Sequence, residues 1–321
     1  MPKIRYNSTY KSTEGVVWKV EMIDDEYDST PADFTIESLE INYQSDRDDL
    51  IFAEILASEI TLVALSENTA FDAFINQLFE AAENRFFVKV YKNTNLYWVG
   101  QLLPDASGME DAYYPQKITL KAVDGLARLK SIDFNSNGSG GFTTTGNFTF
   151  TALLFAILAD LRTIGLWDAT DVFLDHNVHW ADAAHVSGVS VLENTRVDYV
   201  PFYHLDDDNL VIYKTSYEVL EKVCEAWSMR IMLEGGVWKF RQLNEYELSS
   251  SVTYLYLKNG SYSTTGQAIS RTTSGTRLAT QNFSYLPALK SIHQCYVHNS
   301  DANFLSGKVI NLSSGLQTVA R

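Results

Sequence analysis

The sequence predicts a β-rich α+β protein with two related domains. A chain of 321 residues is too long for one ordinary core, because domains average about 100–200 residues. Its 18 Tyr and 17 Phe against 6 Pro favour strands, since aromatic side chains fit a half-buried pleated surface. A helix followed by a β-hairpin occurs twice, roughly 145 residues apart, too far for a solenoid repeat. The two copies indicate either a duplicated domain or a common unit that arose twice by chance.

The first predicted domain covers residues 1–130. Segments rich in β-branched and aromatic residues predict strands at 16–23, 60–65 and 116–123. Between them, apolar residues at three- and four-residue steps predict a helix over 71–82 with one buried face: Phe71, Phe74, Ile75, Leu78, Phe79 and Ala82. A hairpin over 85–103 follows, and its turn, KNTN at 92–95, is expected to be longer than the turn of the second copy.

Residues 131–210 form a predicted middle region with a linker. The stretch 134–149 is rich in Gly, Ser, Thr and Asn, which is typical of a loop or linker. A helix over 151–165 follows, with Leu154, Phe155, Leu158 and Leu161 on one face and Gly165 as its C-terminal stop. Residues 168–210 alternate poorly and are interpreted as loops and short strands between helices.

The second predicted domain covers residues 211–321. Thr215 or Ser216 can cap a helix whose apolar face comprises Val219, Leu220, Val223, Cys224 and Trp227. Gly235-Gly236 between two alternating runs predicts a hairpin over 228–243. Further strands are expected at 209–214, at 252–258 and around HQCYVH at 293–298. The last residues carry no closing signal, so we expect the native chain to continue.

The formal net charge of −15, with a sequence pI near 4.8, argues against tight binding of nucleic acid. Affinity for a polyphosphate comes largely from Lys and Arg. An acidic wall can still serve where DNA must pass without adhering, and the charge also fits a solvated surface.

The cysteines and the apolar runs give no indication of a disulfide framework, a secretory signal or a membrane span. Cys224 and Cys295 make no disulfide framework, so both are expected to be buried free thiols. The N-terminal residues contain no apolar stretch of the kind that secretory signals need. The longest apolar run, LLFAILA at 153–159, is far shorter than the ~20 residues of a membrane span.

The most tempting candidate for chemistry is DHNVHWADAAH at 175–185. Its imidazoles and carboxylates could surround zinc or iron, and the candidate ligands are Asp175, His176, His179, Asp182 and His185. The spacing matches neither HExxH nor a two-His-one-carboxylate site, and Cys is absent nearby. We interpret these residues as loop histidines with ordinary hydrogen bonds.

The other motifs also favour ordinary turns and loops over binding or catalytic sites. HLDDDN at 204–209 lacks the alternating oxygens of a calcium loop, so it predicts a solvated turn before the strand LVIYK. GSGGF at 138–142 lacks the Lys-Ser/Thr of a phosphate-binding loop, and the sequence contains no G-x-S-x-G elbow. A glycosidase pair cannot be singled out among 40 acids. We therefore predict no catalytic residue, no cofactor-binding residue, no metal ligand and no cofactor, and a protein that is not an enzyme.

Several segments together resemble a known family. They are EGVVWKVEMID near the start, RFFVKVYKNTNLYWVGQLLPD with YYPQKITLKAVDGLARLK, SYEVLEKVCEAWSMRIMLEGGVWKFRQL, and FSYLPALKSIHQCYVH. In pattern and order they resemble baseplate hub or tail-tip proteins of tailed bacteriophages, particularly those of Bacteroidetes-type hosts. The residues that carry the resemblance are Trp18, Trp98, Gly100, Asp124, Gly125, the helix 219–227, Gly235, Trp238 and Pro287. In place of the Phe-Gly pair common before the second hairpin, this chain has Ala226-Trp227.

The resemblance implies a structural virion protein in the phage tail, assembled in the host cytoplasm. It implies two β-barrel-like, tail-tube-type domains, each with a helix, plus the helical insertion in the middle region. Subunits would form a ring, preferentially a trimer with a hexamer as the alternative. The ring would join the tail tube to the tip and leave a channel for DNA during ejection. Implied partners are tube, distal tail and tail-fibre or tip proteins, with DNA only in transit and no membrane-spanning segment.

Two other functions remain open at this stage. A hexameric distal tail protein would share the belt domain that forms the ring and lack the helical insertion at 151–165. A tail-associated lysin, peptidase or glycan hydrolase would place its activity beyond Arg321, and this chain would then be its non-catalytic N-terminal part.

Overall fold

The computed structural model describes residues 3–12, 15–46, 53–66, 69–80, 85–109, 114–134, 147–178, 190–198, 200–206, 208–242 and 252–268. Several sequence predictions therefore lie outside the described residues. These are the linker apart from its two ends, the strand at 293–298, Pro287, and the side chains of Ala82, His179, Asp182, His185 and Cys295.

Thirteen of the described strands belong to one mixed sheet. Twelve follow the order β17-β16-β10-β15-β14-β5-β8-β7-β6-β2-β1-β3, and β4 branches from β5. Their bounds are β1 Lys3–Lys11, β2 Val17–Asp24, β3 Ala32–Asp33, β4 Thr35–Gln44, β5 Ile55–Ser66, β6 Phe86–Lys92, β7 Asn95–Met109, β8 Gln116–Val123, β10 Val172–His176, β14 Met229–Glu234, β15 Val237–Gln242, β16 Val252–Leu257 and β17 Tyr262–Ala268. The predicted β-rich α+β class, with more strand than helix, is confirmed.

Two small sheets and few helices complete the described fold. The small sheets pair β9 (Asn147–Thr149) with β11 (Arg196–Asp198) and β12 (Tyr203–Leu205) with β13 (Val211–Tyr213). The helices are α1 Thr69–Glu80, α2 Phe150–Ala159, α3 Val191–Asn194 and α4 Ser216–Trp227, with 3-10 turns η1 Leu126–Ser131, η2 Arg162–Leu166 and η3 Val200–Phe202. The predicted strand at 209–214 is confirmed only over the three residues of β13.

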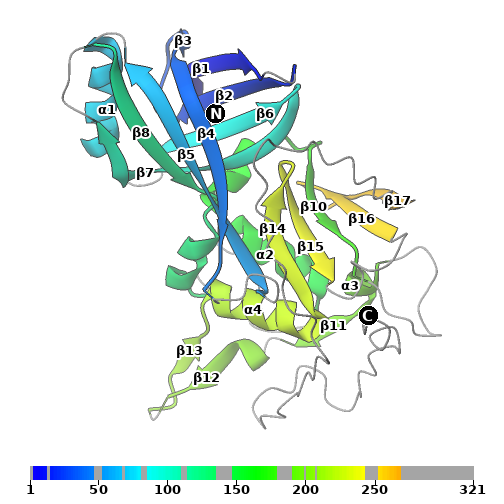
Figure 1. Cartoon of the computed structure of the whole chain (residues 1–321). Helices are drawn as coiled ribbons and strands as arrows, with labels where there is room; N and C mark the ends of the chain where they lie inside the picture. The colour runs from blue at the N-terminus through cyan, green and yellow to red at the C-terminus, as the bar shows by residue number, and fades with distance from the viewer. Residues whose placement is uncertain are drawn as a thin grey trace, which may run out of the picture.

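Strand β5 joins the two halves of the sheet. Its first residues, Ile55 and Leu56, pair in parallel with Ile231 and Met232 of β14. From Glu59 onward it pairs antiparallel with β8. Figure 1 shows the consequence: β1 to β8 with α1 form the upper part, and β10 with β14 to β17 lie below, beside α2 and α4. Buried side chains from Tyr6 to Tyr256 belong to one hydrophobic cluster.

Helix α1 confirms the predicted periodicity with one exception. Four of the predicted apolar residues are at most 5% exposed: Phe71, Phe74, Ile75 and Leu78. The aromatic members pack on other rings of the core. The ring centroid of Phe74, for example, lies 5.4 Å from that of Phe86 in edge-to-face geometry. The prediction is wrong for Phe79, which is 42% exposed because it lies at the margin of the apolar stripe.

Helix α4 confirms the second predicted helix and its cap. The Thr215 hydroxyl accepts the N–H of Glu218, and the Glu218 carboxylate accepts the N–H of Thr215, which makes a capping box. The predicted apolar face is fully buried, including the free thiol of Cys224. Local sequence thus determines both the start and the orientation of this helix.

Helix α2 is shorter than predicted. It ends at Ala159, and Gly165 lies inside the following 3-10 turn, so the predicted C-terminal stop is wrong. The Asp160 carboxylate accepts a hydrogen bond of 2.7 Å from the Ser216 hydroxyl at the start of α4. This tertiary contact ties the C-terminal end of α2 to the start of α4.

Both predicted hairpins form, and both have two-residue loops. Gly235 and Gly236 have φ of 62° and 73°, as a type I′ turn requires. Asn93 and Thr94 also have positive φ, 57° and 106°, and the flanking residues Lys92 and Asn95 pair with each other. The first loop is therefore no longer than the second, contrary to the prediction, because Asn and Thr here accept the left-handed region.

Candidate functional site

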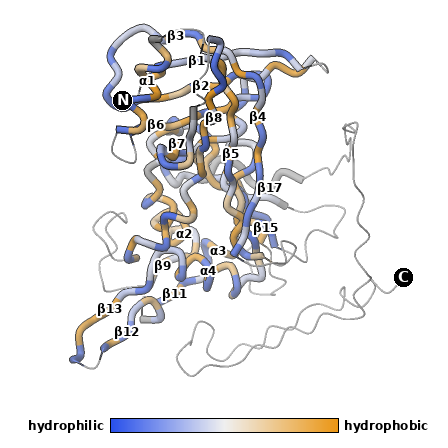
Figure 2. Tube along the Cα trace, turned by 60° about the vertical axis from the view of Figure 1, so that its left-hand side comes forward, coloured by the Kyte–Doolittle hydropathy of each residue, from blue (hydrophilic) through white to orange (hydrophobic). Residues whose placement is uncertain are grey.

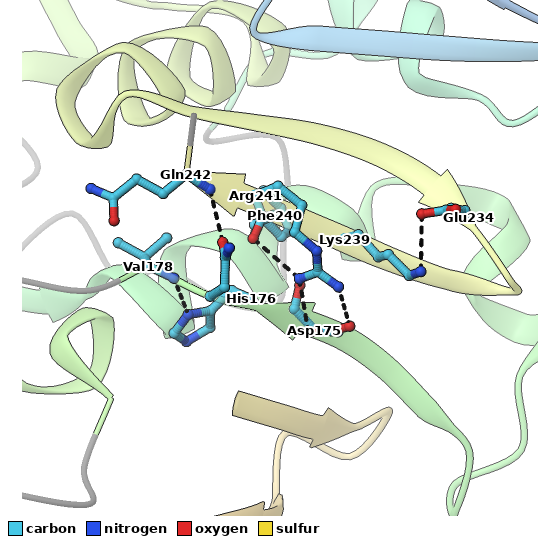
Figure 3. A network of polar contacts seen from close by, with 9 residues as sticks. Asp175, His176, Val178, Glu234, Lys239, Phe240, Arg241 and Gln242 are labelled. Carbon is cyan, nitrogen blue, oxygen red and sulfur yellow. Dashed lines mark hydrogen bonds and ion pairs between the residues drawn. The ribbon is translucent and has the colours of Figure 1, made fainter. Parts of the chain in front are cut away.

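Two of the polar residues singled out in the sequence, Asp175 and His176, lie where β10 pairs with β15. The two strands run parallel, and Figure 3 shows Asp175 of β10 facing Arg241 of β15, whereas the ring of His176 points the other way, toward Val178. Arg241 donates hydrogen bonds to the Asp175 carboxylate from both terminal guanidinium nitrogens, and its Nη1 lies 2.9 Å from Oδ1. Both side chains are only about a tenth exposed. The carboxylate is therefore neutralised by a fixed internal partner and is not held open for a metal ion.

His176 is completely buried beneath Tyr254 and Tyr256 of β16. Its Nδ1 accepts the N–H of Val178 at 3.2 Å, and its Nε2 lies 2.8 Å from the Ser190 hydroxyl. Burial, and secondly the charge of Arg241, lower the pKa of His176 to about 3, so the ring is neutral near pH 7. Because Nδ1 is an acceptor, the single ring proton sits on Nε2 and is donated to Ser190.

This tautomer makes the Ser190–His176 contact unsuited to nucleophilic catalysis. A general base must accept the serine proton, whereas here the imidazole donates to the serine oxygen. The same oxygen also accepts the N–H of Leu192 at the start of α3. Ser190 is 1% exposed, so a substrate has no access to it. The contact is a structural hydrogen bond that ties β10 to α3.

The interpretation of the candidate cluster as loop histidines is wrong for His176, which lies in strand β10, although its ring nitrogens do make ordinary hydrogen bonds. Asp175 and His176 point to different partners, and the remaining candidates, His179, Asp182 and His185, lie outside the described residues. Among the residues that the structure describes, no group of three or more His, Cys, Asp or Glu side chains could hold a metal ion.

The predicted turn at HLDDDN is confirmed, and the carboxylate of its first aspartate, Asp206, accepts hydrogen bonds from the turn itself. Asp206 Oδ1 accepts the N–H groups of Asp208 at 2.9 Å and Leu210 at 2.7 Å. Asn209 takes the left-handed conformation, with φ of 60°. The turn is closed by the chain's own amides, in the manner of an Asx turn.

Two of the residues that carry the family resemblance, Trp98 and Asp124, lie in one buried network. Trp98 of β7 donates its indole N–H to the Ser58 hydroxyl at 2.9 Å, and Ser58 donates to Asp124 at 2.8 Å. Asp124 also accepts the N–H groups of Ser58 and Leu126. Burial raises the pKa of Asp124 to about 6, although these hydrogen bonds act in the opposite direction. The network joins β5, β7 and the turn into η1.

Two glycines in these segments permit close backbone contacts. A Cβ on Gly100 would lie 2.4 Å from the carbonyl oxygen of Val123, and one on Gly236 would lie 2.5 Å from that of Leu96. Gly236 donates its N–H to the Tyr97 carbonyl at 2.7 Å, and its own carbonyl accepts the indole N–H of Trp167 at 2.8 Å. The turn of the second hairpin therefore docks on β7 of the first. We call this contact the hairpin junction.

The two tryptophans that follow the hairpin turns are core residues. Trp98 is 1% exposed and Trp238 is fully buried. Their place after each hairpin turn in the sequence favours core anchors on the inner faces of the hairpins, and their burial confirms this interpretation. Trp18 is half-buried and packs edge-to-face on Tyr97, 5.2 Å away.

The sequence interpretation missed the buried ion pairs. Besides Arg241, it overlooked Asp24, which is fully buried and contacts Arg5 and Arg85 at 2.8 Å each. Burial alone would raise the pKa of Asp24, but hydrogen bonds from Arg85, the Glu26 amide and Arg5 hold it below its ordinary value. Only Arg241 could have been recognised from the sequence as a buried charge, because it follows the core residue Phe240 in a short predicted strand.

Comparisons with known proteins give no assignment. A scan against models of protein families finds no matching family, and a search of curated proteins finds no match. In the described part of the chain, no helix is both long enough and apolar enough to cross a membrane.

Proposed function

We propose that the chain is a structural subunit of a phage tail, in the baseplate hub or tail-tip ring. The observation that carries the proposal is the placement of the resemblance residues Trp98, Gly100, Asp124 and Trp238. All four residues are buried. The resemblance therefore concerns a scaffold, which is what a ring-forming protein needs.

The finer architecture is also part of this proposal. Two units support a pair of tail-tube-type, barrel-like domains: α1 with β6–β7, and α4 with β14–β15. Their sheet neighbours differ, since β6–β7 lies between antiparallel strands and β14–β15 between parallel ones. The duplication therefore rests on the units themselves, and the division at 130 and 210 stays a prediction.

Charge and edges are consistent with a ring around a DNA channel. The net charge of −15 disfavours adhesion of phosphate, which suits DNA in transit. Strand β4 pairs with β5 on one side, and as an end strand it suits pairing with a neighbouring subunit. The buried helix α2 favours a hub over a distal tail protein, which would lack the middle helix.

The deciding experiment is a symmetry-resolved cryo-EM reconstruction of the native phage tail. We expect three copies around the tail axis next to the tube. Six copies would favour the distal tail ring, and absence of the chain from the particle would contradict the proposal. In parallel, the purified chain should leave peptidoglycan and polysaccharide intact. Turnover that a single Asp or Glu substitution abolishes would replace the structural function by an enzymatic one.

A further inference from the structure

A two-stranded hairpin projects from the lower part of the molecule. Strands β12 and β13 pair only with each other within the described residues, and Figures 1 and 2 show them extending away from the body. We call residues 203–213 the arm. Its base is firmly attached: Phe202 is 2% exposed and packs 5.2 Å from Phe134. Backbone hydrogen bonds also join Lys214 to Phe202 and Phe134 to Lys214.

The arm exposes an unusual share of apolar side chains. Half of the eight large hydrophobic residues that are exposed in the described structure lie on it: Leu205, Leu210, Val211 and Ile212, at 42–63% exposure. In the strand register Tyr203 faces Tyr213 and Leu205 faces Val211, so these four share one face of the ribbon. Figure 2 shows the hydrophobic character of β13. Clustered exposed apolar side chains of this kind mark an interaction surface.

The arm is a preformed surface. Asp206 donates its N–H to the Leu210 carbonyl at 3.0 Å, and its carboxylate accepts two amides of the turn. An isolated two-stranded ribbon is marginal in water unless another surface packs on it. Its apolar face therefore suits a partner with a matching apolar face.

The charges of the arm are arranged from end to end. Asp206 and Asp208 lie at the tip, and Lys214 lies at the base. Two arms packed antiparallel about a two-fold axis bring each acidic tip beside the other's basic base. Their apolar faces of Tyr203, Leu205, Val211 and Tyr213 then meet, whereas Ile212, which is paired with His204, lies on the opposite face of each ribbon. In such an isologous contact the same residues serve on both sides.

We infer that the arm is a self-association surface, whose occupant is the antiparallel arm of a second copy of this chain. The apolar face offers four side chains per copy, far fewer than the roughly 20–30 residues per partner of a stable complex. The contact is therefore weak and reversible by itself, and becomes effective when other contacts hold copies close together. This inference does not depend on the proposed ring, which uses other surfaces.

Charge exchange in the full-length purified chain tests the inference. Sedimentation equilibrium of the native chain at ~0.15 M salt should show a concentration-dependent monomer–dimer equilibrium. Asp208→Lys and Lys214→Glu should each weaken dimerisation at least tenfold, because the first places a lysine opposite Lys214 and the second places a glutamate opposite Asp208 at each end of the contact. Mixing the two variants should restore dimers, since opposite charges then face each other at both ends.

An apolar variant with a matched control completes the test. Leu205→Ser with Val211→Thr should also abolish dimerisation, while Phe79→Ser, at a similarly exposed site on α1, should leave it unchanged. Circular dichroism establishes that each variant is folded. The inference is overturned if the native chain stays monomeric at millimolar concentration, or if the mixed variants do not associate. Dimers that persist in all arm variants would assign self-association to another surface and leave the ring proposal untouched.

Discussion

The hairpin junction can be tested by two substitutions in one turn. Gly235 and Gly236 both have positive φ, so alanine at either position costs about 1–2 kcal/mol in backbone strain. They differ in surroundings: a Cβ on Gly235 meets nothing within 4 Å, whereas one on Gly236 lies 2.5 Å from the Leu96 carbonyl. Gly235→Ala is thus a control for the strain alone.

The extra cost at Gly236 follows from its contacts. Ordinary van der Waals contact begins at 3.4 Å, so the turn must move by 3.4 − 2.5 = 0.9 Å. That shift breaks the hydrogen bonds of Gly236 to Tyr97 and Trp167. Leaving such buried groups unpaired costs about 1–3 kcal/mol each. We therefore expect Gly236→Ala to lower the unfolding free energy by roughly 3–8 kcal/mol, strain included, against about 1–2 kcal/mol for the control.

Urea unfolding followed by tryptophan fluorescence and circular dichroism measures both values. Trp98 lies in the first hairpin and Trp238 in the second, and both are buried, so their fluorescence reports on the packing of the hairpins. If the two alanine variants lose the same free energy within about 0.5 kcal/mol, the second hairpin is not docked on β7 and the reasoning fails.

Two further predictions concern the buried polar groups. Arg241→Met should destabilise the chain by about 3–5 kcal/mol, because it leaves Asp175 buried without its cation, and adding Asp175→Leu should recover most of the loss in the same urea assay. Equal losses in the single and double variants would show that the pair does not behave as one unit. The pKa of Asp124 is raised to about 6, so its stabilising contribution is present below its ordinary value near 3.8 and is lost as pH rises through 6. The pKa of His176 is lowered to about 3, so stability is lost as pH falls below 6.5 toward 3. Asp124→Asn should therefore steepen the loss of unfolding free energy between pH 6.5 and 4, and an unchanged slope would contradict this assignment.

Features governed by neighbouring residues were accessible from the sequence. The face of α4 follows from apolar residues at three- and four-residue steps, and Thr215 with Glu218 specifies its start. Gly235-Gly236 specifies the second turn, since few other residues accept its φ values. The ordinary interpretation of HLDDDN also holds, because its carboxylate bonds to amides two and four residues away.

Features governed by distant residues were not accessible. Gly165 was a reasonable helix stop, yet α2 ends earlier where Asp160 meets Ser216, 56 residues away. Asp175 could be recognised as a candidate ligand, but its actual partner is Arg241, 66 residues away. Such pairs depend on which strands become neighbours, and spacing along the chain carries no record of that choice.

The sequence by itself determined the β-rich class, the two helix-hairpin units and their buried tryptophans. Periodicity, capping and turn preference act over a few residues, so they operate before any tertiary contact exists. Only the tertiary structure decided that β5 is shared by both halves, that one hairpin turn docks on the other hairpin, and that the arm exposes its apolar face. Those outcomes depend on the pairing of strands, where a side chain's surroundings are set by residues far away in the chain.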